Sequence, residues 1–360
     1  MSSANSPATH FLIQGLIADI RPLGNGLIND TFLVTTHEAE TPDYVLQRIN
    51  HAIFTDVDLL QHNIEAVTSH IRQKLMAQGV KDISRRVLQF VPTPEGKTYY
   101  FDGESYWRLS VFIPDTQTFS EVTPSHSYDA GLAFGQFEQM LTDLPEPLGE
   151  TIPDFHNMEL RMRQLNEAIA SDPVGRVGSV QEELILIAAH ADEMCQAEQL
   201  HKEGKLPKRI CHCDTKVNNM LFDKDGHVLC VIDLDTVMPS FVFSDYGDFL
   251  RTAGNTVAED SPALADIAFR MDIFEAFTRG YLQSAGSFLT PLEIDHLPYA
   301  VALFPFMQAV RFLADYLNGD TYYKIQYADH NLVRTRNQLR YFQCVEASRP
   351  AMEAFIKQLP

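Results

Sequence analysis

The sequence predicts an α+β protein with two lobes: a small β-rich lobe over residues 1–114 and a larger, mainly helical lobe over residues 115–360. Three observations lead to this prediction. The chain has 360 residues, more than one small core needs. Runs of β-forming residues with turn signals are concentrated before Pro114, and helical periodicity dominates after it. We expect a cleft between the lobes, where ligand sites tend to lie.

The first lobe is expected to contain several strands and one helix. The runs "DTFLVTT" and "DYVLQRIN" predict paired strands within residues 30–50. Residues 56–78 show helical periodicity, because their apolar side chains recur near one helix face. Further β-rich runs cover residues 85–93, 97–101 and 104–113. Asp-Gly at residues 102–103 is a strong hairpin signal between the last two.

Helical patterns dominate the second lobe, apart from a β-rich island over residues 210–237. In that island a strand ending in "MLF" and a strand "HVLCVID" are joined by a turn at Asp225-Gly226. The expected helices cover residues 127–141, 158–170, 181–200, 265–283, 292–317 and 331–358.

Composition excludes several classes of partner. Hydrophobic residues make up 45% of the chain and charged residues 21%, as in ordinary globular proteins. The net charge of −20 would repel nucleic acid and anionic membrane surfaces, although a local cluster of cations could still bind an anionic small molecule. The five cysteines are odd in number and suit reduced core thiols. No signal peptide and no apolar run of membrane-spanning length is visible, so we expect a cytoplasmic, soluble monomer or weak homodimer.

Two stretches have residues suited to phosphate chemistry. In "PLGNGLINDTFLV", Gly24 and Gly26 precede a strand, and such turns let backbone N–H groups approach phosphate oxygens; an ordinary tight turn is the alternative. In "ICHCDTKVNNMLF", Asp214 precedes Asn219 by five residues, and the following strand pair ends in Asp233. Carboxylate and amide oxygens are ligands suited to Mg²⁺, and Lys216 could meet a phosphate.

The pattern His-x-Asp-x-Lys-x-x-Asn, followed by a strand ending in Ile-Asp, resembles the catalytic loop and metal-binding Asp of the protein-kinase-like fold. The later element reads Asp-Leu-Asp, which is closer to the aminoglycoside phosphotransferase family of small-molecule kinases. Longer stretches are similar to N-acetylhexosamine 1-kinases, namely "HCDTKVNNMLFDKDG", "VLCVIDLDTVMP", "SDYGDFLR" and "RFLADYLNGDTYYK". The resemblance covers nearly the whole chain.

The resemblance implies a role for each residue of the loop. Asp214 would align the acceptor hydroxyl and could also deprotonate it, and Lys216 would contact the transferring phosphoryl group. Asn219 and Asp233 would hold Mg²⁺ against the phosphates of ATP. Asn218 has no firm role; the spacing favours its neighbour as the ligand.

In the first lobe the resemblance implies that Gly24 and Gly26 cover the phosphates, although Asn29 replaces the third glycine of the kinase loop. Arg48 stands where the kinase lysine is expected, with Glu65 as its helical partner; a solvated helix face is an equal alternative for this glutamate.

For the acceptor pocket, the resemblance favours Arg311, a charge within an otherwise apolar helix. Arg251 and His156 are weaker candidates, for which a salt bridge or a satisfied core group is the alternative. Asp235 is a candidate for substrate binding, for a second metal bond or for a structural role. Asp245 and Asp248 are expected to brace the catalytic loop, and His212 to be a buried scaffold residue.

The implied activity is transfer of the ATP γ-phosphate to the anomeric hydroxyl of an N-acetylhexosamine (N-acetylglucosamine or N-acetylgalactosamine). The alternatives are another hydroxyl acceptor, such as an aminoglycoside, choline or homoserine, and a non-catalytic nucleotide-binding protein. A protein kinase is disfavoured, because the chain has neither an Ala-Pro-Glu motif nor a long phosphorylatable loop after Asp233.

Overall fold

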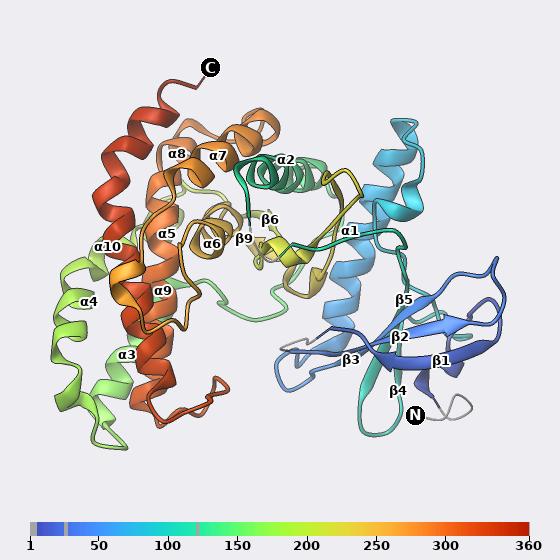
Figure 1. The fold of residues 1–360 in the computed structure, drawn as a ribbon, viewed down its shortest axis with the longest axis horizontal. Coiled ribbons are helices and arrows are strands. Elements are labelled where there is room, and N and C mark those ends of the chain that lie inside the picture. The colour runs from blue at the N-terminus through green and yellow to red at the C-terminus, as the bar shows by residue number, and fades with distance from the viewer. Residues whose placement is uncertain (1–5, 25–27, 120–121, 360) are drawn as a thin grey trace. The chain divides into compact units, whose positions relative to one another are not determined.

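The computed structural model describes residues 6–24, 28–119 and 122–359, which divide into two compact units (Figure 1). The first unit contains residues 1–118, 143–153 and 220–237, and the second contains the remainder. The first unit thus takes in two segments that lie beyond the expected boundary at residue 114. One of them, residues 220–237, includes Asp233 and the strand pair that precedes it.

An antiparallel sheet forms the body of the first unit. Its described strands pair in the order β1 (Ile17–Pro22), β2 (Asp30–Thr36), β3 (Tyr44–Ile49), β5 (Tyr106–Val111) and β4 (Tyr99–Phe101). The strands expected within residues 30–50 and the hairpin at residues 102–103 are confirmed. Helix α1 (Val57–Ala77) is capped by Asp56, whose carboxylate accepts the N–H of Leu59 at 2.9 Å and so satisfies a free donor of the first turn.

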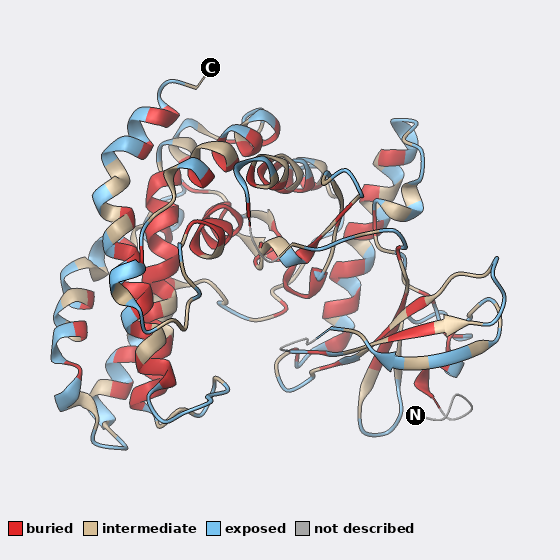
Figure 2. Cartoon of the chain, in the orientation of Figure 1, coloured by how far each residue is buried: buried red, intermediate tan, exposed pale blue. Residues whose placement is uncertain are grey.

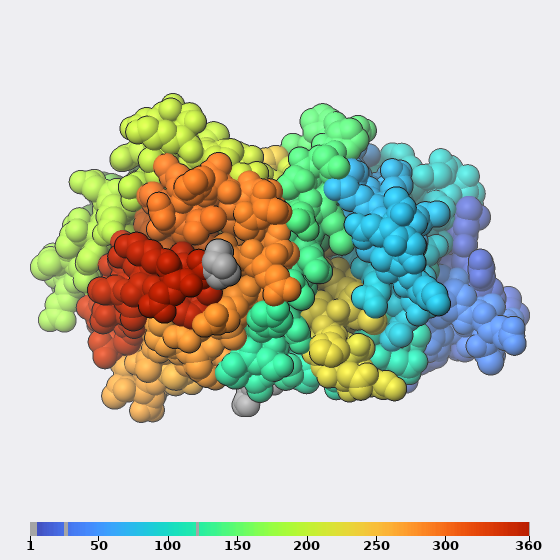
Figure 3. All heavy atoms as spheres, turned by 90° about the horizontal axis from the view of Figure 1, so that it is seen from above, coloured from blue at the N-terminus to red at the C-terminus, as the bar shows by residue number. Residues whose placement is uncertain are grey.

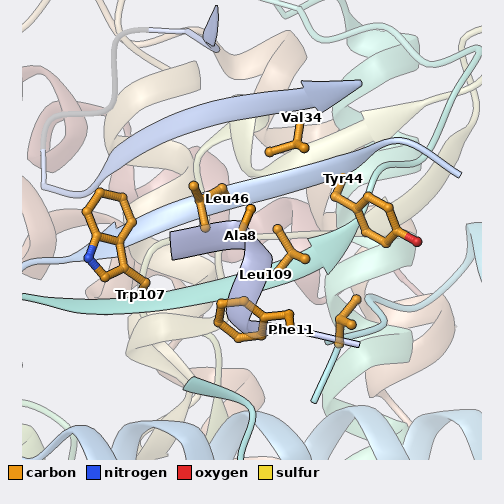
Figure 4. Packing of buried hydrophobic residues seen from close by; sticks show 8 residues of the cluster. Ala8, Phe11, Val34, Tyr44, Leu46, Trp107 and Leu109 are labelled. Carbon is orange, nitrogen blue, oxygen red and sulfur yellow. The ribbon is translucent and has the colours of Figure 1, made fainter. Parts of the chain in front are cut away.

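One face of this sheet packs on the N-terminal 3₁₀ helix η2 (Pro7–His10) (Figure 4). The cluster contains Ala8, Phe11, Val34, Tyr44, Leu46, Val91, Trp107 and Leu109. Side chains alternate between the faces of a strand, so Tyr44, Leu46 and Arg48 of β3 share this face. Gln47 therefore faces the opposite side.

The expected strand over residues 85–93 was wrong. Its start is occupied by the 3₁₀ helix η3 (Ile83–Arg85), and Pro92 has no N–H for a ladder. The segment still binds the edge of β5, since the N–H of Val91 donates to the carbonyl of Leu109 and the N–H of Val111 donates to that of Gln89, both at 2.8 Å. It therefore continues the edge that β4 occupies at the other end of β5.

Strands β7 (Met220–Phe222) and β8 (Val228–Val231) form the expected antiparallel pair around Gly226, whose φ of 87° suits glycine. The 3₁₀ helix η6 (Leu234–Thr236) follows. Asp233, between β8 and η6, has φ 60° and ψ 58°, in the left-handed region. Residues other than glycine rarely adopt this backbone conformation, and such strain concentrates at functional sites.

The second unit is mainly helical. Its short elements are β6 (Arg209–Cys211), β9 (Met238–Ser240) and the 3₁₀ helices η4 (Val177–Ser179), η5 (Val217–Asn219) and η7 (Leu264–Asp266). Its α-helices are α2 (Pro124–Leu141), α3 (Met158–Ser171), α4 (Gln181–Met194), α5 (Gln196–Lys202), α6 (Phe243–Ala253), α7 (Met271–Ala285), α8 (Pro291–Asp295), α9 (Leu297–Leu317) and α10 (His330–Ile356). The expected run over residues 292–317 is thus two helices, separated at His296.

Helix α9 forms the core of the second unit and is buried along most of its length (Figure 2). Helices α3, α6 and α10 pack against it, and α10 also contacts α7 (Figure 1). In Figure 3 the red surface of α10 adjoins orange segments of the same unit. Contrary to expectation, this 21-residue helix is long and apolar enough to cross a membrane, since an 18-residue window within it has a mean hydropathy of 1.4. In the structure, however, 83% of that window is buried inside the protein, as in a core helix.

Helices α2 and α7 approach closely because glycines leave room for backbone contact. A Cβ atom on Gly131 would lie 2.2 Å from the carbonyl oxygen of Phe277, and one on Gly280 would lie 2.0 Å from that of Tyr128. Backbone atoms cannot yield as the end of a side chain can. These two glycines therefore set the spacing of the pair.

Gly280→Ala is expected to lower the free energy of unfolding by about 1–3 kcal/mol, because the added methyl group overpacks the interface. Equilibrium urea unfolding would measure the change. Gly178→Ala is the matched control, since nothing lies within 4 Å of its added Cβ. Equal stability of the two variants would contradict the close approach of α2 and α7.

Candidate active site

The loop after β6 is held by Asp245 of helix α6. Its carboxylate accepts the N–H of His212 at 2.8 Å and that of Cys213 at 2.7 Å, and its carbonyl accepts the Thr215 hydroxyl at 2.7 Å. Cys213, directly before Asp214, has φ 64°, so the turn needs such restraint. The expected bracing role of Asp245 is confirmed.

His212 supports the same loop from inside the unit. The ring is fully buried and makes edge contacts with Phe134 and Phe137. Its Nδ1 accepts the N–H of Asp214 at 3.3 Å, which confirms the expected scaffold role. Cys211 and Cys213 are buried free thiols, as expected; burial raises their pKa and keeps them protonated.

Asp214, Lys216 and Asn219 lie together, as the motif predicted. Lys216 Nζ lies 2.8 Å from Asp214 Oδ1, and Asn219 Nδ2 donates to the Asp214 carbonyl at 2.8 Å and to Oδ2 at 3.0 Å. Asn218 is exposed, whereas Asn219 is buried. The amide that contacts the Asp214 carboxylate is therefore the one with the five-residue spacing.

Burial and the ion pair act in opposite directions on these two charges. Burial is the largest single effect on the pKa of Asp214 and raises it, yet Lys216, His212 and Asn219 together bring the pKa below the ordinary value. Burial likewise favours neutral Lys216, but Asp214 and Asp248 together outweigh that effect, so the pKa of Lys216 is raised. Both groups are charged at neutral pH. The Asp214 carboxylate can then accept a hydrogen bond from an alcohol.

Arg311 and His156 lie in the same unit as the loop. The Arg311 guanidinium lies 5.5 Å from the Phe155 ring and 5.7 Å from the Tyr323 ring, and Nη1 donates to Gln308 at 3.2 Å. Within the described residues, no carboxylate lies at ion-pair distance from this guanidinium. His156 bonds Ser244 at 3.0 Å; burial and Arg311 lower its pKa well below the ordinary range, so its ring is neutral.

Arg161 of helix α3 was missed by the sequence reasoning. It donates to the carbonyl oxygens of Phe155 at 2.6 Å and Asp154 at 3.1 Å. Burial, followed by the charge of Arg311, lowers its pKa to about 10, which places the two guanidinium groups near each other. The only sequence signal was its position three residues after Met158, on a helix whose exposed face carries many charges.

Asp315 positions the aromatic residues beside Arg311. Its carboxylate accepts the N–H groups of Thr321, Tyr322 and Tyr323 at 2.8–2.9 Å and the amide of Asn331 at 2.9 Å. The polar residues of "RFLADYLNGDTYYK" thus form a fixed turn after helix α9.

Arg251 is engaged in ion pairs. Its Nε lies 2.9 Å from Asp248 and its Nη1 lies 2.6 Å from Glu259, and its side chain is buried. These two carboxylates raise its pKa further despite burial. The salt-bridge alternative therefore accounts for the charge of Arg251. Asp248, which was expected to brace the loop, is an ion-pair partner of this arginine.

The first unit contains a buried polar cluster around Asp235. Arg108 Nη1 lies 2.5 Å from Asp235 Oδ1, and Asn29 Nδ2 donates to Oδ2 at 2.7 Å. Arg108 Nε also donates to Gln47 at 3.0 Å, across the β3–β5 ladder. Both carboxylate oxygens of Asp235 are therefore occupied, which favours the structural role among the three alternatives. A charge within the apolar run "YWRLSV" was the signal for Arg108.

The expected pair of Arg48 and Glu65 is not formed. Arg48 is half exposed and forms an ion pair with Asp30, whereas Glu65 accepts a hydrogen bond from Thr98. The reason is strand alternation, because Arg48 shares the face of Tyr44 and Leu46. Gly24 has φ 70°, which suits a glycine turn; Gly26 lies outside the described residues.

The phosphotransferase enzyme family matches residues 19–285 of the chain. An aminoglycoside phosphotransferase from Alicyclobacillus acidocaldarius has a similar structure, with a TM-score of 0.62 and 13% identity over 98% of this chain and 96% of that one. A microcompartment-associated aminopropanol kinase gives 0.63 and 16% over 96% of each chain. An amicoumacin kinase in complex with AMP-PNP, Ca²⁺ and Ami gives 0.58 and 14% over 92% and 91%. These likenesses confirm the predicted α+β, kinase-like fold.

Arg108→Met is expected to lower the free energy of unfolding by about 3–5 kcal/mol, because it leaves the buried Asp235 carboxylate without its cation. Arg48→Met, on the neighbouring strand, removes a half-exposed pair that contributes less than about 1 kcal/mol. Urea unfolding would compare the two. The double variant Arg108→Met/Asp235→Asn should recover part of the loss; a similar small effect of both single changes would refute the buried pair.

Proposed function

Because the chain belongs to the phosphotransferase enzyme family, we propose that it transfers the γ-phosphate of ATP to the anomeric hydroxyl of N-acetylglucosamine or N-acetylgalactosamine. The products are the hexosamine 1-phosphate and ADP. The observation that carries the phosphotransfer is the joint placement of Asp214, Lys216 and Asn219 on one braced loop. Phosphoryl transfer needs positioning and charge neutralisation more than covalent chemistry, and this loop supplies both.

In this proposal Asp214 accepts the hydrogen bond of the acceptor hydroxyl and orients its oxygen for attack. Its lowered pKa keeps the carboxylate ionised at neutral pH, as this role requires. Lys216 donates to the transferring phosphoryl group and balances its charge. Gly24 and Gly26 are proposed to cover the phosphates from the glycine turn.

The donor chemistry fits a divalent cation. Asn219 commits Nδ2 to Asp214, which leaves Oδ1 as the atom suited to a hard metal ion, and Asp233 supplies a carboxylate from a strained backbone position. Asn219 and Asp233 are therefore the proposed Mg²⁺ ligands. When bound with ATP, the metal ion would neutralise phosphate charge. The amicoumacin kinase structure holds a nucleotide analogue and Ca²⁺, which supports nucleotide and divalent-ion use in this fold.

The charges near His156 favour a neutral acceptor over an amine. After burial, Arg311, Arg161 and Arg251 depress the pKa of His156, and Asp214 acts in the opposite direction, so positive charge predominates in this region. A cationic acceptor such as choline or an aminoglycoside would be repelled there. A sugar instead offers hydroxyl and carbonyl oxygens to guanidinium donors and an apolar ring face to Phe155 or Tyr323. These charges and rings therefore favour a hexosamine over an amine acceptor.

We expect ATP- and Mg²⁺-dependent ADP release with N-acetylglucosamine or N-acetylgalactosamine in a panel of free sugars, amines and amino alcohols. Asp214→Asn should lower kcat by at least about 100-fold, since it removes the carboxylate that orients the hydroxyl, and should retain ATP binding. Turnover of an amine without turnover of either hexosamine would reject the proposed acceptor. A near-wild-type rate for Asp214→Asn would reject the role given to this residue.

Arg311→Met is expected to raise the KM for the sugar about tenfold or more, because a charged hydrogen bond to the acceptor is lost. The KM for ATP should stay within about twofold. Arg279→Met is the matched control, since Arg279 also lies over an aromatic ring, 4.7 Å from Phe355, on an exposed helix face. Steady-state kinetics with both substrates varied would separate the effects; an unchanged sugar KM would exclude Arg311 from the acceptor site.

A further inference from the structure

A carboxyl group that the proposed chemistry does not use lies behind the catalytic loop. Glu138 of helix α2 is only 2% exposed, and the Tyr281 hydroxyl donates to its Oε2 at 2.6 Å. Its Oε1 is buried and has no hydrogen-bond partner among the described residues, and the Asp245 side chain lies close enough to bond to it if one of the two carboxyl groups carries a proton. Ligand atoms of Glu138, Asp245 and Cys211 all lie within 4.8 Å of one another. Glu138 thus contacts the residue that holds the loop.

Two ionised carboxylates cannot hydrogen-bond to each other, because neither has a donor. A proton on one of the two groups would therefore join this buried pair. Burial raises the pKa of Asp245 too, but two backbone N–H groups donate to its carboxylate and stabilise its charged form. Glu138 receives one bond from a neutral hydroxyl in a buried setting, so its charge is stabilised less.

The other groups around Glu138 do not supply a cation that would ionise it. Tyr281 of α7 and Cys211 of β6 are neutral, since burial raises the pKa of each well above its ordinary value. Arg209 of β6 is the positive charge that acts on Glu138, and its Nε is paired with Glu293 at 2.6 Å. The proton therefore stays on the glutamate.

We propose that Glu138 is a neutral carboxylic acid whose O–H donates a hydrogen bond to Asp245 and thereby fixes the carboxylate that holds the catalytic loop. Its Oε2 accepts from Tyr281 while its O–H donates to Asp245, so helices α2, α6 and α7 are joined through one carboxyl group. Asp245 in turn orients the backbone of His212 and Cys213, next to Asp214. Glu138 is thus a positioning residue, which acts on the reaction only through Asp245.

The pH dependence of folding follows from this protonation. Burial, followed by the charge of Asp245, raises the pKa of Glu138 well above its ordinary value in the folded state. The unfolded chain releases this proton near pH 4.3 and the folded chain retains it. The contribution of Glu138 to stability is therefore full below the unfolded pKa and is lost as the pH rises toward the folded pKa.

Glu138→Gln tests the proposal without disturbing the geometry, because the amide N–H₂ can donate to Asp245 while its oxygen accepts from Tyr281. Infrared difference spectra at neutral pH should show, in the wild type, a carbonyl stretch of a protonated carboxyl group that Glu138→Gln lacks. Glu198, whose pKa burial raises to about 7, would give a second band that Glu198→Gln identifies. Glu293→Gln should remove no such band, since Glu293 is an ion-paired carboxylate.

Unfolding by urea between pH 5 and 8 gives a readout that needs no substrate. Relative to Glu138→Gln, the ratio of folded to unfolded wild type should fall about tenfold per pH unit, because only the wild type must keep a proton on folding. Parallel pH profiles of the two proteins, or a spectrum without the carboxylic-acid band, would overturn the proposal. A divalent metal ion bound by Glu138, Cys211 and Asp245 would also overturn it, and metal analysis of the purified protein tests for that ion.

ADP release links the proton to the loop. Glu138→Leu leaves Asp245 without this donor and should lower kcat about tenfold, with the sugar KM within about twofold. Glu138→Gln should restore the wild-type kcat to within about twofold. Equal loss in both variants would show that ionised glutamate is required and would refute the shared proton. Absence of turnover in the wild type would instead refute the proposed function, while the spectra and the unfolding profiles would still decide the protonation of Glu138.

Discussion

The buried carboxylate of Asp245 is the contact on which the candidate active site depends. It accepts the N–H groups of His212 and Cys213, in a turn where Cys213 adopts a left-handed conformation. A side chain with a Cβ atom does not stay in that conformation without restraint. Asp245 provides the restraint from helix α6, and the buried ring of His212 provides it from within the loop. Asp214 is placed between these two anchors and the amide of Asn219.

Several buried charges in both units have an oppositely charged partner that offsets the cost of removing them from water. Asp235 has Arg108, and Arg251 has Asp248 and Glu259. Asp214 is paired with Lys216 but remains partly exposed, so an alcohol can still reach it. Arg311 differs, because no carboxylate among the described residues pairs with it. A guanidinium that lies over aromatic rings without a counter-ion can donate hydrogen bonds to a ligand, which is the role we propose for it.

The sequence was sufficient for much of the fold. The strands within residues 30–50, the hairpin around residues 102–103, helix α1 and the strand pair around Gly226 all follow from local periodicity and turn residues. The segment 85–93 was mispredicted because its apolar composition suits a strand, whereas Pro92 and the helix η3 prevent a regular ladder. The length of the apolar run in helix α9 was underestimated, because Arg311 and Asp315 interrupt the run without ending the helix.

The sequence by itself determined the chemistry of the loop, because Asp214, Lys216 and Asn219 lie within six residues and local spacing decides which of them meet. Local spacing does not reveal the role of Asp245, because this residue lies more than thirty positions after the backbone groups that it holds. Tertiary structure alone decided which arginine is buried in the first unit. Arg48 and Arg108 both lie on strands, but alternation places Arg48 on the face of Tyr44 and Leu46, beside its cross-strand partner Asp30, whereas Arg108 lies opposite Gln47 and meets Asp235 of the distant helix η6. The partner of a buried charge depends on contacts between distant segments, and residue spacing along the chain does not encode them.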